Sequence, residues 1–180
     1  MSSNRSAEGG PAAVLIGSMG AGKSSVGHAL ALRLGVGFRD TDEDIETRAG
    51  MTIAELFVSQ GESHFRALEL EAVRHALAEH PGVLALGGGA PMQPAVAELL
   101  AGHRVVFLDV GLAEAVRRVG LGTSRPLLLG NVRGQLRTRL EERRPVYEAL
   151  AWLTMKVDTA TVDDIAAEIA VELAQAEVAR

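Results

Sequence analysis

A glycine-rich loop that ends in Lys23 and Ser24 carries the residue types and the spacing that most clearly indicate chemistry. The stretch Gly17–Ser24 has the pattern G-x-x-x-x-G-K-[ST], the Walker A signature, and it lies between an apolar run, Ala12–Ile16, and a stretch with helical spacing, Ser25–Leu34. In such a loop, backbone N–H groups and the N-terminus of the following helix bind phosphate, the lysine contacts the terminal phosphates, and the hydroxyl ligates Mg²⁺. A turn that merely joins a strand to a helix is the alternative, which the Lys-Ser ending disfavours. The loop therefore predicts binding of a nucleoside triphosphate.

Two carboxylates, Asp40 and Asp42, follow the second predicted strand, and ligands of open α/β sheets bind beyond the carboxyl ends of the strands. If the strand persists, the two side chains point the same way, so one could hold Mg²⁺ or its waters and the other could accept a hydrogen bond from a substrate hydroxyl. The alternative is that this segment caps a helix that starts near Glu43. The cap is the better interpretation of the segment alone, but beside a Walker A loop a magnesium site is favoured, because few other strand ends offer a carboxylate.

Three consecutive glycines, Gly87–Gly89, follow the third predicted strand. Such a run is costly in conformational entropy, so we interpret it as backbone that a ligand approaches closely, with a flexible turn as the alternative. Arg66, near the start of the longest predicted helix, could project into the same cleft and bind the carboxylate of an anionic substrate through its planar guanidinium. For a helical arginine taken alone, an exposed ion pair is the more common role.

Further arginines surround a glycine-rich segment at residues 119–131, the least regular part of the chain. A loop of that length inside a domain is usually functional or disordered, and we predict an active-site lid. Arg117, Arg118 and Arg125 are candidates for phosphate and base contacts. Arg118 is the best candidate to pack against adenine, because aromatic residues make up only 3% of the chain. The run Arg143–Tyr147 is expected to end a helix, where the helix dipole alone favours cations.

These residues require a scaffold of parallel strands separated by helices, and the pattern along the chain predicts one. Short apolar runs alternate with amphipathic stretches, which is typical of an α/β domain whose sheet has helices on both faces. The predicted strands are Ala12–Ile16, Gly37–Arg39, Val83–Leu86, Arg104–Asp109 and Leu153–Val157. The predicted helices are Gly22–Leu34, Thr52–Gln60, Glu62–Glu79, Pro94–Leu100, Val132–Glu142 and Val162–Val178.

The composition limits the kinds of protein that this chain can be. The chain has 180 residues, 47% of them hydrophobic and 23% charged, so we assign residues 11–180 to a single globular domain and residues 1–10 to a short disordered tail. The absence of cysteine excludes disulfides, thiolate metal sites and a cysteine nucleophile. The net charge of −5 argues against nonspecific nucleic-acid binding, and no apolar run is long enough to span a bilayer. Because no signal-peptide pattern is present either, we expect a cytoplasmic monomer without a nucleic-acid or membrane partner.

Taken together, the motifs resemble those of the shikimate kinase family over nearly the whole chain, from Ala13 to Val171. Six matches occur in order: GSMGAGKS (Gly17–Ser24) with Gly27 beyond it, DTD (Asp40–Asp42), GESHFR (Gly61–Arg66), GGGA (Gly87–Ala90), RPLL (Arg125–Leu128) and RRPVY (Arg143–Tyr147). Any one of them is a weak or moderate signal, whereas six in this order are specific. The resemblance implies a P-loop fold like that of nucleoside monophosphate kinases: a three-layer α/β/α structure with a five-stranded parallel sheet, a lid and substrate-binding segments.

The resemblance also implies a reaction, namely transfer of the γ-phosphoryl group of ATP to the 3-hydroxyl of shikimate on the route to chorismate and the aromatic amino acids, with Mg²⁺ as the cofactor. The implied catalytic residues are Lys23, Asp42 and Arg125. The implied ATP-binding residues are Gly20, Ala21, Gly22, Lys23, Ser24, Ser25, Arg118 and Arg125. The implied shikimate-binding residues are Asp42, Arg66, Gly87, Gly88, Gly89 and Arg143. Ser24 and Asp40 are the implied metal ligands.

Two features depart from the family pattern. Ser25 stands where the family often has threonine, and Asp158–Asp163 lacks the proline often found in the adenine-binding loop, so we assign no adenine contact there. A kinase of the same fold that acts on another small molecule, such as gluconate, is the closest alternative. A nucleotide-dependent switch protein is disfavoured, because the chain has neither an Asn-Lys-x-Asp nor an Asp-x-x-Gly motif.

Overall fold

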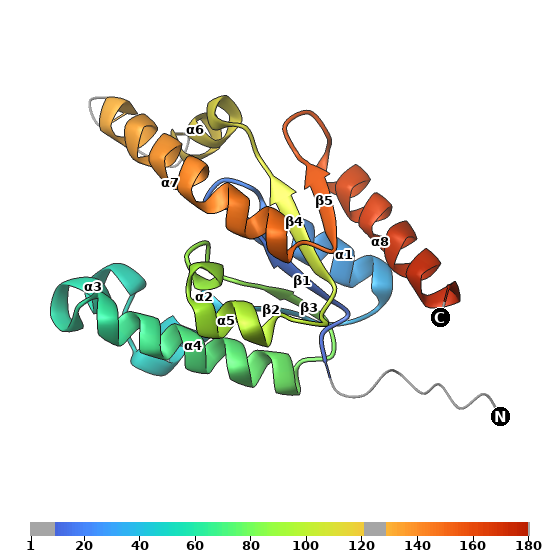
Figure 1. Cartoon of the computed structure of the whole chain (residues 1–180), viewed down its shortest axis with the longest axis horizontal. Helices are drawn as coiled ribbons and strands as arrows, with labels where there is room; N and C mark the ends of the chain where they lie inside the picture. The colour runs from blue at the N-terminus through green and yellow to red at the C-terminus, as the bar shows by residue number, and fades with distance from the viewer. Residues whose placement is uncertain (1–9, 121–128, 180) are drawn as a thin grey trace.

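The computed structural model describes residues 10–120 and 129–179. Within them the chain forms one five-stranded sheet whose strands all run parallel, in the order β2-β3-β1-β4-β5 (Figure 1). The strands are β1 (Ala13–Ile16), β2 (Phe38–Asp40), β3 (Val83–Ala85), β4 (Val105–Asp109) and β5 (Leu153–Lys156). The predicted five-stranded parallel sheet is confirmed, and the carboxyl ends of all strands lie at one edge of it.

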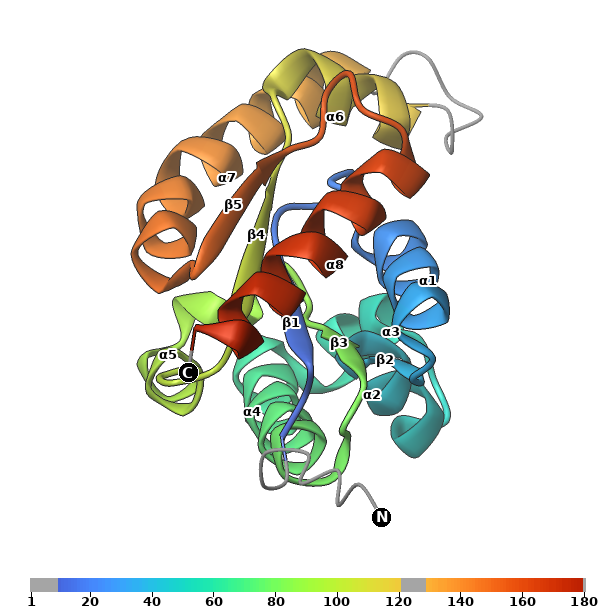
Figure 2. The ribbon, with the colours of Figure 1, turned by 90° about the vertical axis from the view of Figure 1, so that its right-hand side faces the viewer.

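Helices cover both faces of this sheet, which is why its central strands are buried and, apart from Asp109 at the end of β4, apolar. Every residue of β1 and β4 is buried. Helices α1 (Lys23–Leu34) and α8 (Val162–Val178) pack on one face, where Leu30 and Ile169 enter the core. Helices α4 (Glu62–Glu79), α5 (Pro94–Leu99) and α7 (Leu129–Leu150) cover the other face (Figures 1 and 2). The predicted three-layer α/β/α arrangement is confirmed.

A smaller group of helices lies beside the edge strand β2. Helices α2 (Thr41–Ala49) and α3 (Ile53–Gln60) pack against α4 through a cluster that includes Ile45, Leu56 and Phe65. A capping box opens α3, since the Thr52 side chain accepts from the Glu55 N–H and the Glu55 carboxylate accepts from the Thr52 N–H.

The segment after β2 differs from the prediction. Helix α2 begins at Thr41, directly after the strand, so the strand does not persist to Asp42 and the alternative interpretation, a helix cap, describes the local structure. The physical reason is the cap: the Asp40 side chain accepts from the Asp42 N–H at 2.9 Å and closes the first turn of the helix. The short helix α6 (Leu112–Gly120) is not among the predicted elements. Gly111 precedes it and Gly120 ends it, and glycines so close together are typical of a loop.

Helix α7 extends past its predicted end at Glu142, to Leu150, so the expectation that Arg143–Tyr147 ends a helix is wrong. A proline inside a helix removes one backbone hydrogen bond, and Pro145 was therefore a plausible stop. The helix continues because its last turns are held on the sheet by the buried side chain of Tyr147 and by an ion pair of 2.6 Å between Arg144 and Asp109.

Parts of two sequence predictions fall outside the described residues. All of the predicted tail except Gly10 lies there, and so do residues 121–128 of the predicted lid, including Arg125. Within residues 10–120 and 129–179, no helix is both long enough and apolar enough to cross a membrane.

Candidate active site

The glycine-rich loop joins β1 to α1, as predicted. Gly20 and Gly22 adopt left-handed backbone conformations, with φ values of 83° and 87°, and α1 begins at Lys23. Ala21 between them is buried, whereas the side chains of Ser24 and Ser25 are exposed in the first turn of α1. The loop therefore presents two hydroxyl groups and the N-terminus of a long helix on the same side.

Lys23 is held inside this loop. Its Nζ donates to the carbonyl oxygens of Gly17 at 2.8 Å and Ser18 at 3.1 Å. Burial lowers the pKa of Lys23 from 10.5 to about 8, and the carboxylates of Asp42 and Asp40 oppose this shift. A phosphate group in the loop would add negative charge and favour the protonated lysine, so the site is suited to an anion.

Ser24 and Asp40 bring two oxygen ligands together across the end of the sheet. The Ser24 Oγ lies 3.3 Å from Oδ2 of Asp40, while Oδ1 of Asp40 accepts from the Asp42 N–H. Asp40 thus caps α2 with one oxygen and faces the phosphate loop with the other. The two interpretations of Asp40, as a helix cap and as a residue beside the phosphate loop, are compatible.

Asp42 has a buried carboxylate oxygen that stands out in the site. Its Oδ1 is buried and has no hydrogen-bond partner among the residues that the structure describes. Burial, followed by the neighbouring carboxylates of Asp40 and Glu69, raises the pKa of Asp42 from 3.8 to about 6, and Lys23 opposes this shift. A carboxylate with a free oxygen and a pKa near neutrality is suited to accept a hydrogen bond or a proton from a ligand.

The three glycines after β3 are crowded by side chains from three helices. A Cβ atom on Gly87 would lie 2.5 Å from Oδ1 of Asp42, and one on Gly89 would lie 2.6 Å from Nη1 of Arg66. A Cβ atom on Gly88 would lie 3.2 Å from Nη1 of Arg143. None of the three has a positive φ, so the glycines matter here because they let these side chains approach the backbone closely. The predicted substrate residues therefore meet around the end of β3.

Glu69 belongs to this cluster, although sequence reasoning did not find it. Its side chain is 1% exposed, and Oε2 accepts from Nη1 of Arg66 at 2.6 Å and from Nε2 of Gln93 at 2.7 Å. The available signal was the spacing of three between an arginine and a glutamate on one helix, which is too common to be specific. A buried, paired carboxylate can orient Arg66 toward the glycines.

Tyr147 combines a core position with a polar contact. Its side chain is buried, and its hydroxyl donates to the Gly88 carbonyl oxygen at 2.6 Å. The ring packs against Phe107 of β4, with 5.0 Å between the ring centroids. Trp152 is 40% exposed beside Arg104.

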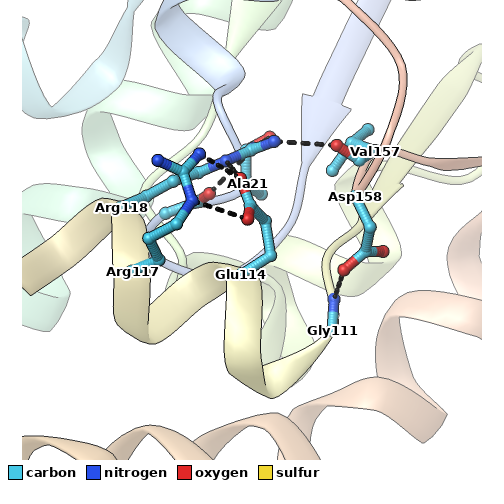
Figure 3. Close-up of polar contacts among 8 residues, drawn as sticks. Ala21, Gly111, Glu114, Arg117, Arg118, Val157 and Asp158 are labelled. Carbon is cyan, nitrogen blue, oxygen red and sulfur yellow. Dashed lines mark hydrogen bonds and ion pairs between the residues drawn. The ribbon is translucent and has the colours of Figure 1, made fainter.

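Arg118 joins the phosphate loop to the end of β5 (Figure 3). Its Nη1 donates to the carbonyl oxygens of Gly20 at 3.1 Å and Ala21 at 3.3 Å, and its Nη2 donates to that of Val157 at 2.7 Å. Its Nε donates to Glu114 at 2.7 Å. Arg118 thus lies between the loop that would hold the phosphates and the strand end where the predicted adenine-binding loop starts.

The loop after β5 is tied to the loop before α6. Oδ1 of Asp158 accepts from the Gly111 N–H at 2.9 Å, as Figure 3 also shows. Arg117, one residue before Arg118, is more exposed and pairs with Glu114 at 2.6 Å, so it contacts the same carboxylate but neither loop. Of these two candidate arginines, only Arg118 reaches both segments.

Comparison with known proteins identifies the family. The family model described as shikimate kinase matches residues 19–174. The chain belongs to the shikimate kinase family. A shikimate kinase of Thermobifida fusca (strain YX) is 57% identical over 163 residues, which make up 91% of this chain and 95% of that protein. The resemblance inferred from six motifs is confirmed, and with it the assignment of the chain to a family of kinases.

Solved structures agree with this membership. A shikimate kinase from Acinetobacter baumannii, in complex with shikimate, has a TM-score of 0.84 and 34% sequence identity, and the match covers 94% of this chain and 95% of that one. A gluconokinase from Sinorhizobium meliloti 1021 has a TM-score of 0.58 and 21% identity, with 91% of both chains covered. That second likeness shows the fold alone, which is the P-loop fold predicted for the family.

The oxygen ligands of Ser24 and Asp40 fit the Mg²⁺ that kinases use with ATP. Mg²⁺ prefers oxygen ligands and in nucleotide sites needs only one or two from the protein, because phosphates and waters supply the rest. Within residues 10–120 and 129–179, no group of three or more His, Cys, Asp or Glu side chains could hold a metal ion. A hydroxyl oxygen and a carboxylate oxygen lie 3.3 Å apart beside the phosphate loop of this shikimate kinase family member, and both are of the kind that Mg²⁺ prefers.

Proposed function

We propose that this chain transfers the γ-phosphoryl group of ATP to the 3-hydroxyl of shikimate, giving shikimate 3-phosphate and ADP. The observation that carries this proposal is a convergence on the glycines after β3. Asp42, whose Oδ1 has no hydrogen-bond partner among the described residues, meets Arg66 and Arg143 there. The cluster adjoins the phosphate loop, because a Cβ atom on Gly88 would lie 3.3 Å from the Gly17 carbonyl oxygen. A hydroxylated acid bound there would be next to the terminal phosphate of a nucleotide.

Arg66 and Arg143 are assigned to the carboxylate of shikimate. They project from α4 and α7 and meet the glycine run at different residues, so a carboxylate between them can be bound from two sides. The guanidinium group binds carboxylates through two parallel hydrogen bonds, which fixes the orientation of the acid as well as its position. The backbone of Gly87–Gly89 would form the floor beneath the ring.

Asp42 is assigned to the hydroxyl that is phosphorylated. Its free Oδ1 would accept a hydrogen bond from the 3-hydroxyl and hold the oxygen in line with the γ-phosphorus. As the new O–P bond forms and the bond to the ADP oxygen breaks, the hydroxyl proton would pass to this carboxylate. The raised pKa of Asp42, about 6, suits such a proton acceptor at neutral pH, because the group is ionised but still basic.

The phosphate loop is assigned to ATP. The backbone N–H groups of Gly20–Ser25 and the Lys23 ammonium would bind the phosphates and stabilise charge on the transferring group. Ser24 and Asp40 would hold the Mg²⁺ ion, which supplies further positive charge at the phosphates. Arg118 would lie against adenine, and Arg125, outside the described residues, stays the proposed lid arginine. These roles are carried over from the motif matches to the family.

A panel of acceptors tests the substrate. Coupled ADP release should be measured with ATP and Mg²⁺ on shikimate, quinate and gluconate, with ³¹P NMR to locate the new phosphate ester. We expect turnover on shikimate and an ester at the 3-hydroxyl. Turnover confined to gluconate would overturn the substrate assignment and support the alternative kinase, although membership of the shikimate kinase family favours shikimate.

The cellular context is proposed on the sequence alone. We expect the chain to act in the cytoplasm as a monomer, with ATP and shikimate as its only partners and without binding nucleic acid or membranes. The net charge of −5 is the feature that supports the absence of a nucleic-acid partner.

A further inference from the structure

Tyr147 is a buried residue of α7 whose hydroxyl reaches the glycines proposed to form the floor of the shikimate site. It donates to the Gly88 carbonyl oxygen at 2.6 Å, although the two residues are 59 positions apart in the sequence. Packing holds the aromatic ring in place, because the side chain is 1% exposed and its ring contacts that of Phe107 in β4. The hydroxyl therefore has little freedom to leave the Gly88 carbonyl.

The same hydroxyl lies beside Arg143. A Cβ atom on Gly88 would be 3.2 Å from Nη1 of Arg143 and 3.7 Å from the Tyr147 hydroxyl, so the two side chains contact the same part of the glycine run. Burial raises the pKa of the Tyr147 hydroxyl, and the nearby Arg143 cation opposes this shift. Residues 143 and 147 are one turn apart on α7, so their side chains share one face of the helix.

The contact at the Gly88 carbonyl also fixes the next N–H group. In a trans peptide the carbonyl and the N–H point in opposite directions, and no cis peptide occurs in the described residues. The Gly89 N–H therefore points away from Tyr147. It donates to no acceptor among the residues that the structure describes. On the far side of the glycine run, the Arg66 guanidinium would lie 2.6 Å from a Cβ atom on Gly89.

We propose that Tyr147 is a positioning residue for the acid substrate, because its hydroxyl sets both the orientation of the Gly88–Gly89 peptide and the position of Arg143. This inference rests on the proposed function, since it assigns the carboxylate and ring of shikimate to Arg66, Arg143 and the glycine floor. Tyr147 does not touch the reacting atoms in this arrangement. Its loss should weaken the binding of shikimate and leave the binding of ATP and the chemical step nearly unchanged.

Tyr147→Phe tests this inference, because it removes only the hydroxyl and keeps the ring against Phe107. The KM for shikimate should rise about tenfold, the loss expected for one well-placed hydrogen bond, while kcat and the KM for ATP change by less than about twofold. The dissociation constant of shikimate, measured by calorimetry, should rise by the same factor. Thr138→Val is the matched control, because it removes a hydroxyl that bonds a backbone carbonyl at 3.1 Å on the exposed side of the same helix.

The possible outcomes are distinct. A KM for shikimate that stays at the wild-type value in Tyr147→Phe overturns the positioning role. Equal rises in the KM values for shikimate and ATP, together with a lower melting temperature, also overturn it, because they indicate a role in stability alone. Lack of shikimate turnover by the wild-type chain would instead overturn the proposed function, so the two failures are separable.

Discussion

The Nη1 atom of Arg66 lies 2.6 Å from Oε2 of Glu69, one turn further along α4, and the Glu69 side chain is only 1% exposed. The same carboxylate oxygen accepts a hydrogen bond from Gln93 at 2.7 Å. A buried carboxylate is costly unless it is paired, so Arg66 both compensates the charge of Glu69 and is oriented by it. The ion pair with the buried carboxylate of Glu69 thus orients Arg66, the arginine proposed to bind the substrate.

Arg66→Lys should weaken the binding of shikimate specifically. An ammonium group is a point charge and cannot bind a carboxylate through two parallel hydrogen bonds while it also pairs with Glu69. We expect the KM for shikimate to rise about tenfold or more, with a smaller change in kcat and none in the KM for ATP. Steady-state kinetics with each substrate varied in turn measures this.

Arg74→Lys is the control for that experiment. Arg74 lies on the same helix and pairs with Glu71 at the same spacing, but both side chains are about half exposed and the contact is 3.2 Å long. Exposed pairs of this kind contribute little, so its kinetics should match those of the wild type. If Arg66→Lys left the KM for shikimate unchanged, the assignment of Arg66 to the substrate carboxylate would be wrong.

Asp42→Asn should abolish most of the turnover and leave ATP binding intact, because asparagine cannot accept the hydroxyl proton. In the wild type, kcat/KM for shikimate should rise with pH through about 6, where Asp42 becomes ionised in the free protein. The pH profile and a calorimetric titration with ATP measure the two effects. Turnover near the wild-type level in Asp42→Asn would remove Asp42 from the mechanism.

The same substitution should stabilise the fold at high pH. Folding raises the pKa of Asp42 from 3.8 to about 6, so the folded state holds the proton more tightly and loses stability as the pH rises through about 6. A neutral asparagine avoids this loss. Because Asp42 is partly exposed, we expect a gain of only about 1 kcal/mol at pH 8 in urea unfolding, vanishing near pH 4. A loss of stability at pH 8 would contradict the raised pKa.

Two substitutions of Asp40 separate its roles. Asparagine is as good a helix cap as aspartate, so Asp40→Asn should keep the stability of α2 but raise the Mg²⁺ concentration needed for half-maximal activity several-fold. Asp40→Ala should show the same Mg²⁺ effect and also lose about 1 kcal/mol of stability with the cap. Magnesium titrations and thermal unfolding measure the two. An unchanged Mg²⁺ requirement in Asp40→Asn would leave Asp40 with the capping role alone.

Arg118→Lys should raise the KM for ATP about tenfold and leave the KM for shikimate unchanged, because one ammonium cannot reach the carbonyls of Gly20 and Val157 together. Arg33→Lys is the control, since Arg33 also donates to a backbone carbonyl, that of Asp163 at 3.4 Å, but on the exposed surface. Equal effects of the two substitutions on ATP would show that Arg118 has no special place in the nucleotide site.

The strands and the phosphate loop could be predicted because their signals are local. Burial on both faces makes a parallel strand apolar throughout, and the loop motif is contiguous in the sequence. The end of α7 could not be predicted in this way. Pro145 is a local stop signal, and it is overridden by contacts of Tyr147 and Arg144 with β4 that the neighbouring residues do not reveal.

The sequence by itself determined the family, the fold class and the residue types of the site, because each depends on short motifs and on the alternation of apolar and amphipathic stretches. Only the tertiary structure decided that Asp42, Arg66 and Arg143 meet at Gly87–Gly89, that Glu69 pairs with Arg66, and that the Tyr147 hydroxyl donates to the Gly88 carbonyl oxygen. The physical reason is that these contacts depend on the order of the strands and on the packing of α2, α4 and α7 at one edge of the sheet. Local periodicity does not encode which side chains that packing brings within hydrogen-bond distance.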